Sequence, residues 1–203
     1  MNIKKMLWTV LAGLVVVAAV LFGRGVSRGV SAAASTAPVG RSAGNPGAAV
    51  KIVEYTDFQC PACAKASDIM HEEVRRNAGK IFLELKYFPL PMHKNARRAA
   101  VVAECSLAQD KFWFMEKLLF SNQKSWEDLA NPDDYFLSLA RGIGCDDLKM
   151  MRCMSDSAVM ARIDNSVREG QGRGVKATPT FFVNGKMVVG HQGLKDAVTE
   201  GLK

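Results

Sequence analysis

Residues Val50–Cys63 read VKIVEYTDFQCPAC, an apolar segment followed by two cysteines that stand three positions apart. The run Val50–Tyr55 is apolar and rich in β-branched residues, so we expect a buried central strand. Cys60 and Cys63 come where the next helix should begin, and the unpaired N–H groups of a helix N-terminus favour the thiolate form of cysteine. Two such thiols can close and open a disulfide.

A C-x-x-C pair also forms half of many zinc sites. This chain has no second C-x-x-C, and its other three cysteines lack the spacing of zinc ligands. The pattern therefore favours redox chemistry over structural metal binding.

The chain after the cysteine pair first predicts a β-α-β unit. Cys63, Ala66 and Met70 recur at intervals of three and four residues, which places them on one face of a helix. Residues 81–88 then form a second apolar strand that ends at Pro89. Two strands joined by a helix are expected to pair in parallel.

The rest of the chain predicts helices and then a hairpin. Helical patterns cover residues 96–107, 112–120, 131–142, 146–154 and 157 to about 169. Beyond the glycines of 170–174, strands at 180–183 and 186–189 flank Asn184-Gly185, the pair that a type I′ turn requires. A short helix after Gly193 completes the expected α/β fold.

The first 22 residues have the composition of a targeting segment. Lys4 and Lys5 precede Met6–Phe22, an uncharged run of 17 residues. A basic start followed by an apolar run predicts export, and a run of this length lies near the lower limit for spanning a bilayer. Residues 1–22 are therefore a signal sequence or an N-terminal membrane anchor, and we favour the anchor because the small-residue cleavage sites lie far beyond Phe22.

Residues 23–48 have the composition of a linker. Six Gly, six Ala and four Ser fill 16 of these 26 positions, without apolar periodicity. We therefore expect a flexible linker over 23–48 that holds a folded domain, residues 49–203, close to the membrane surface.

The net charge of +7 does not indicate nucleic-acid binding. Residues 1–53 carry six basic side chains and no acidic ones, so the remaining 21 basic and 20 acidic side chains nearly cancel. The folded domain thus lacks the excess of Lys and Arg that marks a nucleic-acid-binding domain.

The order of strand, C-x-x-C helix, strand, helical insertion, Thr-Pro hairpin and last helix resembles that of thioredoxin-fold proteins. The size and place of the insertion make the chain similar to the DsbA family of bacterial thiol:disulfide oxidoreductases. The matching motifs are Phe58–Cys63, His93–Ala100, Lys111-Phe112-Trp113 and Thr178-Pro179-Thr180. The resemblance implies an α/β thioredoxin-like fold, with an all-helical insertion at about 92–170 between the β-α-β half and the C-terminal β-hairpin-α half.

The resemblance also implies roles for the two end motifs. Cys60 would be the exposed, attacking cysteine, and Cys63 would resolve the mixed disulfide. Pro179 matches a cis-proline of the family, which would leave the backbone of Thr178 free to pair with an extended substrate. The alternative for Pro179 is an ordinary proline at a strand edge.

Pro61 and Ala62, between the cysteines, would also contact the substrate. Strongly oxidising relatives carry His in the position of Ala62, where a cation stabilises the thiolate and so the reduced form. Without that cation the disulfide should be less oxidising, which leaves the direction of net electron transfer open.

Glu54 precedes Cys60 by six positions, where related proteins keep a buried acid beneath the active site. It shares a strand face with Val50 and Ile52, so burial should raise its pKa and let it relay a proton to or from Cys63. The alternative is an exposed glutamate at the end of the strand.

The other cysteines are Cys105, Cys145 and Cys153. If residues 145–153 form one helix, that pair lies ~12 Å apart, too far for a disulfide. Some DsbA-like proteins carry a second disulfide in the insertion, and the resemblance implies a Cys105–Cys153 bond with Cys145 free. The alternative is three unpaired core residues.

These features favour an exported thiol:disulfide oxidoreductase that acts in the periplasm or at the outer face of the cell envelope, anchored by its N-terminal segment. It would pass its disulfide to cysteine-containing proteins without a cofactor and exchange electrons with a membrane partner, either a quinone-linked oxidase or an electron-donating reductase. The alternative is a membrane-tethered reductase or isomerase with the same site. A remote alternative is a copper-binding or copper-delivery module that uses the two cysteines and methionines.

Overall fold

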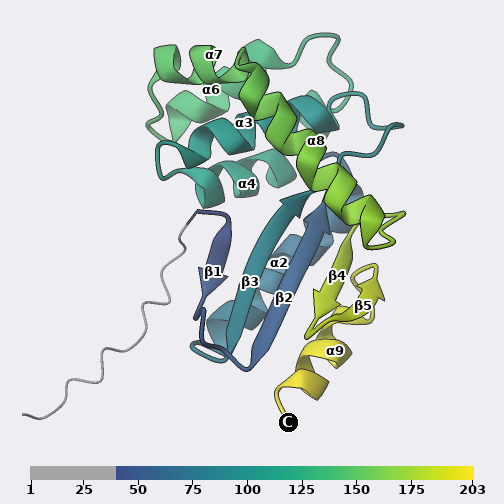
Figure 1. Cartoon of the computed structure of the whole chain (residues 1–203). Helices are drawn as coiled ribbons and strands as arrows, with labels where there is room; N and C mark the ends of the chain where they lie inside the picture. Colours follow the sequence, from purple (N-terminus) through teal and green to yellow (C-terminus); the bar gives the residue numbers. More distant parts are fainter. Residues whose placement is uncertain (1–39) are drawn as a thin grey trace, which may run out of the picture. The chain divides into compact units, whose positions relative to one another are not determined.

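The computed structural model describes residues 40–203 (Figure 1). The predicted anchor or signal sequence at 1–22 and the greater part of the predicted linker at 23–48 lie outside the described residues. Within the described range, no helix combines the length and the apolar composition needed to cross a membrane.

Residues 40–203 contain a five-stranded mixed sheet in the order β1-β3-β2-β4-β5. Its strands are β1 (Ser42–Gly44), β2 (Val50–Thr56), β3 (Ile81–Tyr87), β4 (Thr180–Val183) and β5 (Lys186–Val189). β2 and β3 pair in parallel, as the β-α-β pattern predicts, and β4 pairs antiparallel with β2. Asn184 and Gly185 both have positive φ between β4 and β5, which confirms the predicted hairpin.

Helices cover both faces of this sheet (Figure 1). These are α2 (Pro61–Arg76) and α9 (Leu194–Gly201) on one face and α8 (Ser157–Gly172) on the other. Val50 and Ile52 of β2 point toward α2 and α9, where they join an apolar cluster with Met70. Tyr55 points to the opposite face and packs with Val167 of α8. Because side chains alternate along a strand, Glu54 lies on the face that α2 covers.

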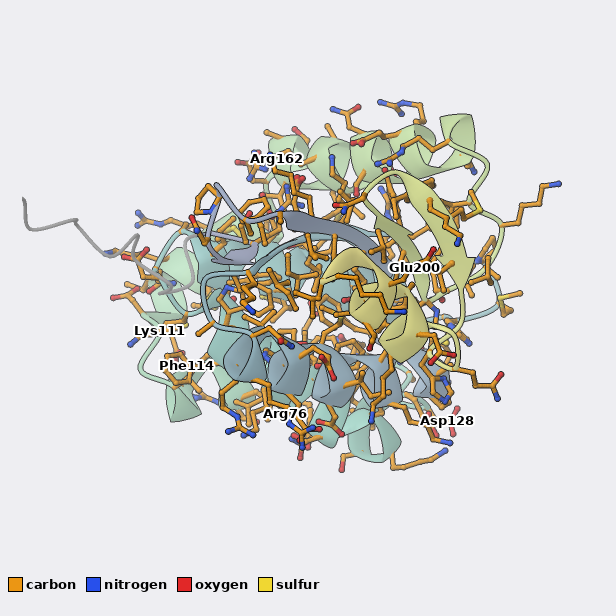
Figure 2. The ribbon with its side chains drawn as sticks, turned by 90° about the horizontal axis from the view of Figure 1, so that it is seen from below. Arg76, Lys111, Phe114, Asp128, Arg162 and Glu200 are labelled. Carbon is orange, nitrogen blue, oxygen red and sulfur yellow. A yellow bond between two sulfur atoms is a disulfide. The ribbon has the colours of Figure 1, made fainter. Side chains whose placement is uncertain are left out.

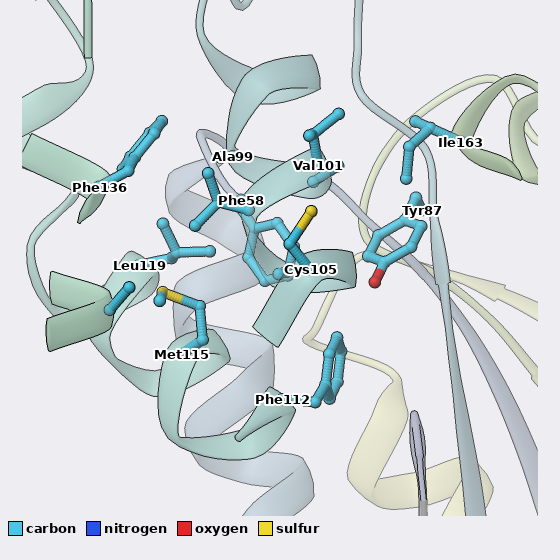
Figure 3. Packing of buried hydrophobic residues seen from close by; sticks show 14 of the residues in the cluster. Phe58, Tyr87, Ala99, Val101, Cys105, Phe112, Met115, Leu119, Phe136 and Ile163 are labelled. Carbon is cyan, nitrogen blue, oxygen red and sulfur yellow. The ribbon is translucent and has the colours of Figure 1, made fainter. Parts of the chain in front are cut away.

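The helical insertion lies between β3 and β4. Besides α8 it contains α3 (Ala96–Leu107), α4 (Phe112–Ser121), α5 (Gln123–Trp126), α6 (Asp133–Gly142) and α7 (Asp147–Met154). Its apolar core includes Phe58, Met115 and Phe136 (Figure 3). A Cys105–Cys153 disulfide joins α3 to α7, which is the pairing that the family resemblance implies. The predicted fold class, a thioredoxin-like fold with an all-helical insertion, is confirmed.

The prediction of a linker over 23–48 is wrong at its C-terminal end. Ser42–Gly44 form β1, which pairs antiparallel with β3, and both Ala43 and Ala48 are buried. Gly44 has a φ of +89°, and a Cβ there would lie 2.2 Å from the carbonyl oxygen of Ile81, so the position requires glycine. Main-chain hydrogen bonds to β3 stabilise β1. Its small residues form no apolar pattern, so the sequence does not predict a strand there.

Helix α8 extends to Gly172, beyond its predicted end near residue 169. A Cβ on Gly170 would lie 2.7 Å from the ring of Phe88 and 2.9 Å from that of Tyr55. The glycine that suggested a helix end therefore allows α8 to pack closely against the sheet.

Candidate active site

Cys60 is the N-cap residue of α2, and Pro61 begins the helix. Proline suits the first helical position because its missing N–H would have no partner there. The Cys60 thiol donates to the carbonyl of Thr178 over 3.4 Å. Only 8% of Cys60 is exposed and none of Cys63, so the expectation that Cys60 is exposed is wrong, and its role as the attacking cysteine stays a prediction. The contact with Thr178 explains why Cys60 is covered.

The loop before β4 lies directly against Cys60. Its Thr178–Pro179 peptide bond is cis, the geometry that the resemblance implies. The Thr180 hydroxyl donates to the Ala177 carbonyl over 2.7 Å, and the Gly190 N–H donates to the Pro179 carbonyl over 2.8 Å. Within residues 40–203 the buried Thr178 hydroxyl has no hydrogen-bond partner, so it is free to donate to an ionised Cys60.

The two thiols of the pair differ strongly in acidity. A hydrogen bond from the Cys63 thiol lowers the pKa of Cys60 to about 5 against the effect of burial. The N–H groups of Cys63 and Ala62 and the hydroxyl of Thr178 lower the Cys60 pKa further. Burial raises the pKa of Cys63 well above its ordinary value, and its contact with Cys60 adds to the rise. At neutral pH Cys60 is therefore the thiolate and Cys63 the thiol.

The Thr178 hydroxyl should contribute measurably to the low pKa of Cys60. We expect Thr178→Val to raise the Cys60 pKa by about 1–2 units, because a hydrogen bond to a charged group contributes about 1.5–3 kcal/mol. Ultraviolet absorbance of the thiolate against pH in the reduced full chain measures the value. Thr178→Ser, which keeps the hydroxyl, is the matched control, and equal Cys60 pKa values in the Val and Ser variants would contradict the assignment.

Glu54 lies on β2, on the strand face that α2 covers, two positions before Thr56. Only 2% of it is exposed, so the alternative of an exposed glutamate is excluded. Burial raises its pKa to about 8, and the negative charge of Glu116 adds to the rise. The Thr56 hydroxyl, on the same strand face, lowers the pKa of both Glu54 and Cys63, so it lies within reach of both groups. In the described part of the chain that hydroxyl has no well-formed hydrogen bond, so it is free to rotate between them.

Asp57 is a site residue that the sequence analysis does not single out. Its buried carboxylate accepts from the N–H groups of Gln59 at 2.7 Å and Leu90 at 2.8 Å, and it contacts His93 Nδ1 at 2.8 Å. Its own N–H donates to the Cys63 sulfur over 3.4 Å. Asp57 thus fixes the loop before the cysteines to the segment that enters the insertion.

The amide side chains of Gln59 and Gln123 join the insertion to the same loop, and that of Asn95 fixes the chain within the insertion. Asn95 donates to the carbonyls of Trp126 and Leu129 at 3.0 Å, and its N–H donates to Gln59 Oε1 at 2.8 Å. Gln123 donates to the Cys60 carbonyl at 3.1 Å. The partners of each bond are more than 30 positions apart in sequence, so spacing alone gives no signal for them.

The remaining predicted residues occupy distinct environments. Pro61 is exposed and Ala62 half-buried, which leaves both open to a docking chain. Cys145 is buried with a free thiol, and burial raises its pKa. Across residues 40–203, no three His, Cys, Asp or Glu side chains gather as metal ligands. Met150 and Met154 pack in the insertion core.

Residues 36–199 match the sequence model of the family described as thioredoxin. Among curated proteins, the chain is 34% identical over 158 residues to the "Na(+)/H(+) antiporter NhaA 1" of Mycolicibacterium gilvum (strain PYR-GCK). The match covers 77% of this chain and 24% of that protein, so the chain spans about a quarter of the relative's length.

Two solved structures are similar over most of the described residues. A thioredoxin-like oxidoreductase from Silicibacter pomeroyi DSS-3 has a TM-score of 0.65 and 26% identity, covering 78% of this chain and 90% of that one. BdbD from Bacillus subtilis, in its oxidised form, has a TM-score of 0.69 and 20% identity, covering 80% of this chain and 92% of that one. At this identity the likeness to BdbD concerns the fold.

Proposed function

Because the chain belongs to the thioredoxin family and is DsbA-like in fold, we propose that it is an exported oxidoreductase that introduces disulfides into extracytoplasmic proteins through Cys60 and Cys63. The observation that carries the proposal is the different placement of the two thiols: Cys60 lies at the N-cap of α2 beside Thr178, where its pKa is lowered to about 5, and Cys63 is fully buried. A stable Cys60 thiolate favours the reduced form of the pair, which makes the disulfide form a stronger oxidant.

The first step transfers the disulfide to the substrate. A substrate thiolate attacks Cys60 Sγ, the Cys60–Cys63 bond breaks, and Cys63 leaves with the bonding electron pair. Because the pKa of Cys63 is raised by burial, its sulfur takes up a proton as it leaves. Glu54, with a pKa of about 8, is protonated at neutral pH and supplies that proton through the Thr56 hydroxyl.

The second step releases the oxidised substrate. A second substrate thiolate attacks the substrate sulfur that is bound to Cys60, which forms the substrate disulfide and frees Cys60 as a thiolate. That leaving group is stable because its pKa is about 5. The substrate has lost two electrons and the Cys60–Cys63 pair has gained them, and reoxidation by a membrane partner, such as a quinone-linked oxidase, closes the cycle.

Substrate binding would use the loop beside Cys60. An extended segment can pair with the main chain at Thr178, which precedes the cis-Pro179 bond and the start of β4. Pro61, which is exposed, and Ala62, which is half-buried, lie between the two cysteines and can contact the same segment. Membrane tethering through Met6–Phe22 would bring this surface close to a redox partner in the bilayer.

Ala62 occupies the position where strongly oxidising relatives carry His. In this chain the Cys60 thiolate has other donors: the Cys63 thiol, two N–H groups and the Thr178 hydroxyl. These replace the missing cation as the source of a low Cys60 pKa. They favour a disulfide donor over the reductase or isomerase alternative.

Glu54→Gln should slow the release of Cys63 by ~10²-fold at neutral pH, because a positioned general acid contributes at least that factor. The wild-type rate constant, expressed per substrate thiolate, should fall as pH rises through about 8, where Glu54 loses its proton, and this fall should vanish in the variant. Stopped-flow reduction of the oxidised full chain by a cysteine peptide from pH 5 to 9 measures both effects. Glu84→Gln on the neighbouring strand is the control, and superimposable wild-type and Glu54→Gln profiles would contradict the relay.

The proposed function is tested by mixing the oxidised full chain with a reduced, unfolded cysteine-containing protein. We expect stoichiometric disulfide formation in that protein and reduction of the Cys60–Cys63 pair, measured by mass after thiol alkylation. A chain that leaves the protein reduced, yet reduces insulin when supplied with dithiothreitol, would instead be a reductase.

A further inference from the structure

Glu116 is a buried carboxylate outside the cysteine site. It lies on α4, is 1% exposed, and sits against α2. The Ser67 hydroxyl donates to its Oε1 over 2.5 Å, and His71 Nε2 contacts its Oε2 at 3.0 Å. A buried charge is costly unless it is paired and hydrogen-bonded, and Glu116 has both kinds of partner.

His71 connects this carboxylate to solvent. Its side chain is 44% exposed, whereas that of Glu116 is 2% exposed. The imidazole packs edge-on against Trp113, with ring centroids 5.6 Å apart, in a groove of about 640 Å³ between α2 and α4. Phe114 of α4 points outward (Figure 2). The face of α4 that carries Trp113 and Glu116 is therefore the one that faces α2. A proton can therefore reach His71 from the groove without opening the core.

The other end of this cluster approaches Glu54. Ile52, on the same strand face as Glu54, packs with Ala66 of α2, and Ser67 is the next residue of that helix. Trp113 of α4 contacts the same apolar cluster, one turn before Glu116. Both carboxylates thus lie beneath α2. In the part of the chain that the structure describes, Glu54 Oε1 has no hydrogen-bond partner, and burial together with the charge of Glu116 raises the Glu54 pKa against the smaller effects of the Thr56 hydroxyl and His71.

The charged groups around Glu54 come from two helices. Glu116 of α4 raises its pKa, and His71 of α2 lowers it. The pKa of His71 is itself raised, first by its bond to Glu116 and also by Glu54 and Asp68. The neighbouring strands place uncharged Leu85 and Phe181 opposite Glu54.

We propose that the Glu116–His71 pair is a positioning device for the thiol chemistry: it sets the charge around Glu54 and so controls when Glu54 holds the proton that Cys63 needs. This inference rests on the proposed function of Glu54. While His71 is protonated, it offsets the charge of Glu116. When pH rises and His71 loses its proton, the charge of Glu116 is no longer offset, and Glu54 keeps its own proton to a higher pH. The groove thereby couples external pH to the supply of protons at Cys63.

Replacing His71 and replacing Glu116 should shift the titration midpoint of Glu54 in opposite directions. His71→Gln removes the positive charge but keeps a donor for Glu116, so the titration midpoint of Glu54 should rise by about one unit. Glu116→Gln removes the negative charge, whose effect on Glu54 exceeds that of His71, so the midpoint should fall by about one unit. Glu72→Gln is the control, since Glu72 lines the same groove and pairs with Arg76.

Carbon-13 NMR of the reduced full chain, labelled at glutamate carboxyl carbons, measures the Glu54 midpoint directly, and Glu54→Gln assigns its resonance. Opposite shifts in His71→Gln and Glu116→Gln, with none in Glu72→Gln, support the inference. A wild-type Glu54 midpoint near 8 that neither variant moves would overturn it and leave the proposed relay intact. A Glu54 that titrates near its ordinary value would overturn the relay itself. If Glu116→Gln does not fold, the His71→Gln midpoint alone decides, because that position is half-exposed.

Discussion

A chain carrying Cys63→Ser is expected to accumulate as a mixed disulfide with a disulfide-bonded substrate peptide, whereas a chain carrying Cys60→Ser forms no such adduct. The Cys60 thiolate, with a pKa of about 5, attacks the peptide disulfide and releases one peptide thiol. In the wild-type chain Cys63 then attacks Cys60 and frees the second thiol, so its loss removes the resolving step. Non-reducing electrophoresis and mass spectrometry after acid quenching measure the adduct.

Cys145 provides the internal control for this experiment. It also carries a free thiol, but burial covers it and raises its pKa, so it should not react. The Cys63→Ser chain should therefore carry one adduct, mapped to Cys60, with or without Cys145→Ser. An adduct on Cys145, or equal adduct formation by the Cys60→Ser and Cys63→Ser chains, would show that Cys60 is not the attacking cysteine.

Removal of the Cys105–Cys153 disulfide should give the largest loss of stability. The bond joins α3 to α7 across 48 positions of sequence, so it restricts a long loop in the unfolded chain. Restricting a loop of this length stabilises the folded state by about 3–4 kcal/mol. We expect Cys105→Ala/Cys153→Ala to lower the free energy of unfolding by at least that amount in urea titrations, because buried side-chain packing is lost as well.

Cys145→Ala measures the cost of removing one buried sulfur from the same core. The decrease in the free energy of unfolding should be more than twice as large in Cys105→Ala/Cys153→Ala as in Cys145→Ala. A double variant that unfolds within about 1 kcal/mol of the wild type would show that the disulfide contributes little to stability.

The parts of the fold that the sequence predicts are those with local signals. The apolar run of β2, the spacing of Cys63, Ala66 and Met70 on α2, and the Asn184-Gly185 turn each depend on neighbours within a few positions. Strand β1 escapes prediction because Ser42–Gly44 have no apolar pattern and depend on main-chain pairing with β3. The sequence places the end of α8 too early for a related reason: Gly170 allows close packing against Phe88 and Tyr55 and does not end the helix.

The same distinction holds within the site. Cys60, Cys63 and Pro179 belong to short motifs, and Glu54 follows from its place on a buried strand. Glu116 and Ser67 are 49 positions apart, and Glu116 and His71 are 45 apart, so neither contact leaves a spacing that a single sequence reveals. The residue that contacts Cys60 and shields it from solvent, Thr178, likewise lies 118 positions downstream. The local C-x-x-C motif therefore supplies most of the groups that lower the Cys60 pKa, and the long-range contacts of Thr178 and Glu116 modify the acidity of the site.

The reduction potential of the Cys60–Cys63 pair in the full chain, equilibrated against glutathione, tests the central claim most directly. A stable Cys60 thiolate predicts an oxidising pair, with a value toward the about −120 mV of the strongest oxidant of this class. A value near or below about −250 mV would instead match a reductase and contradict the proposed donation of disulfides.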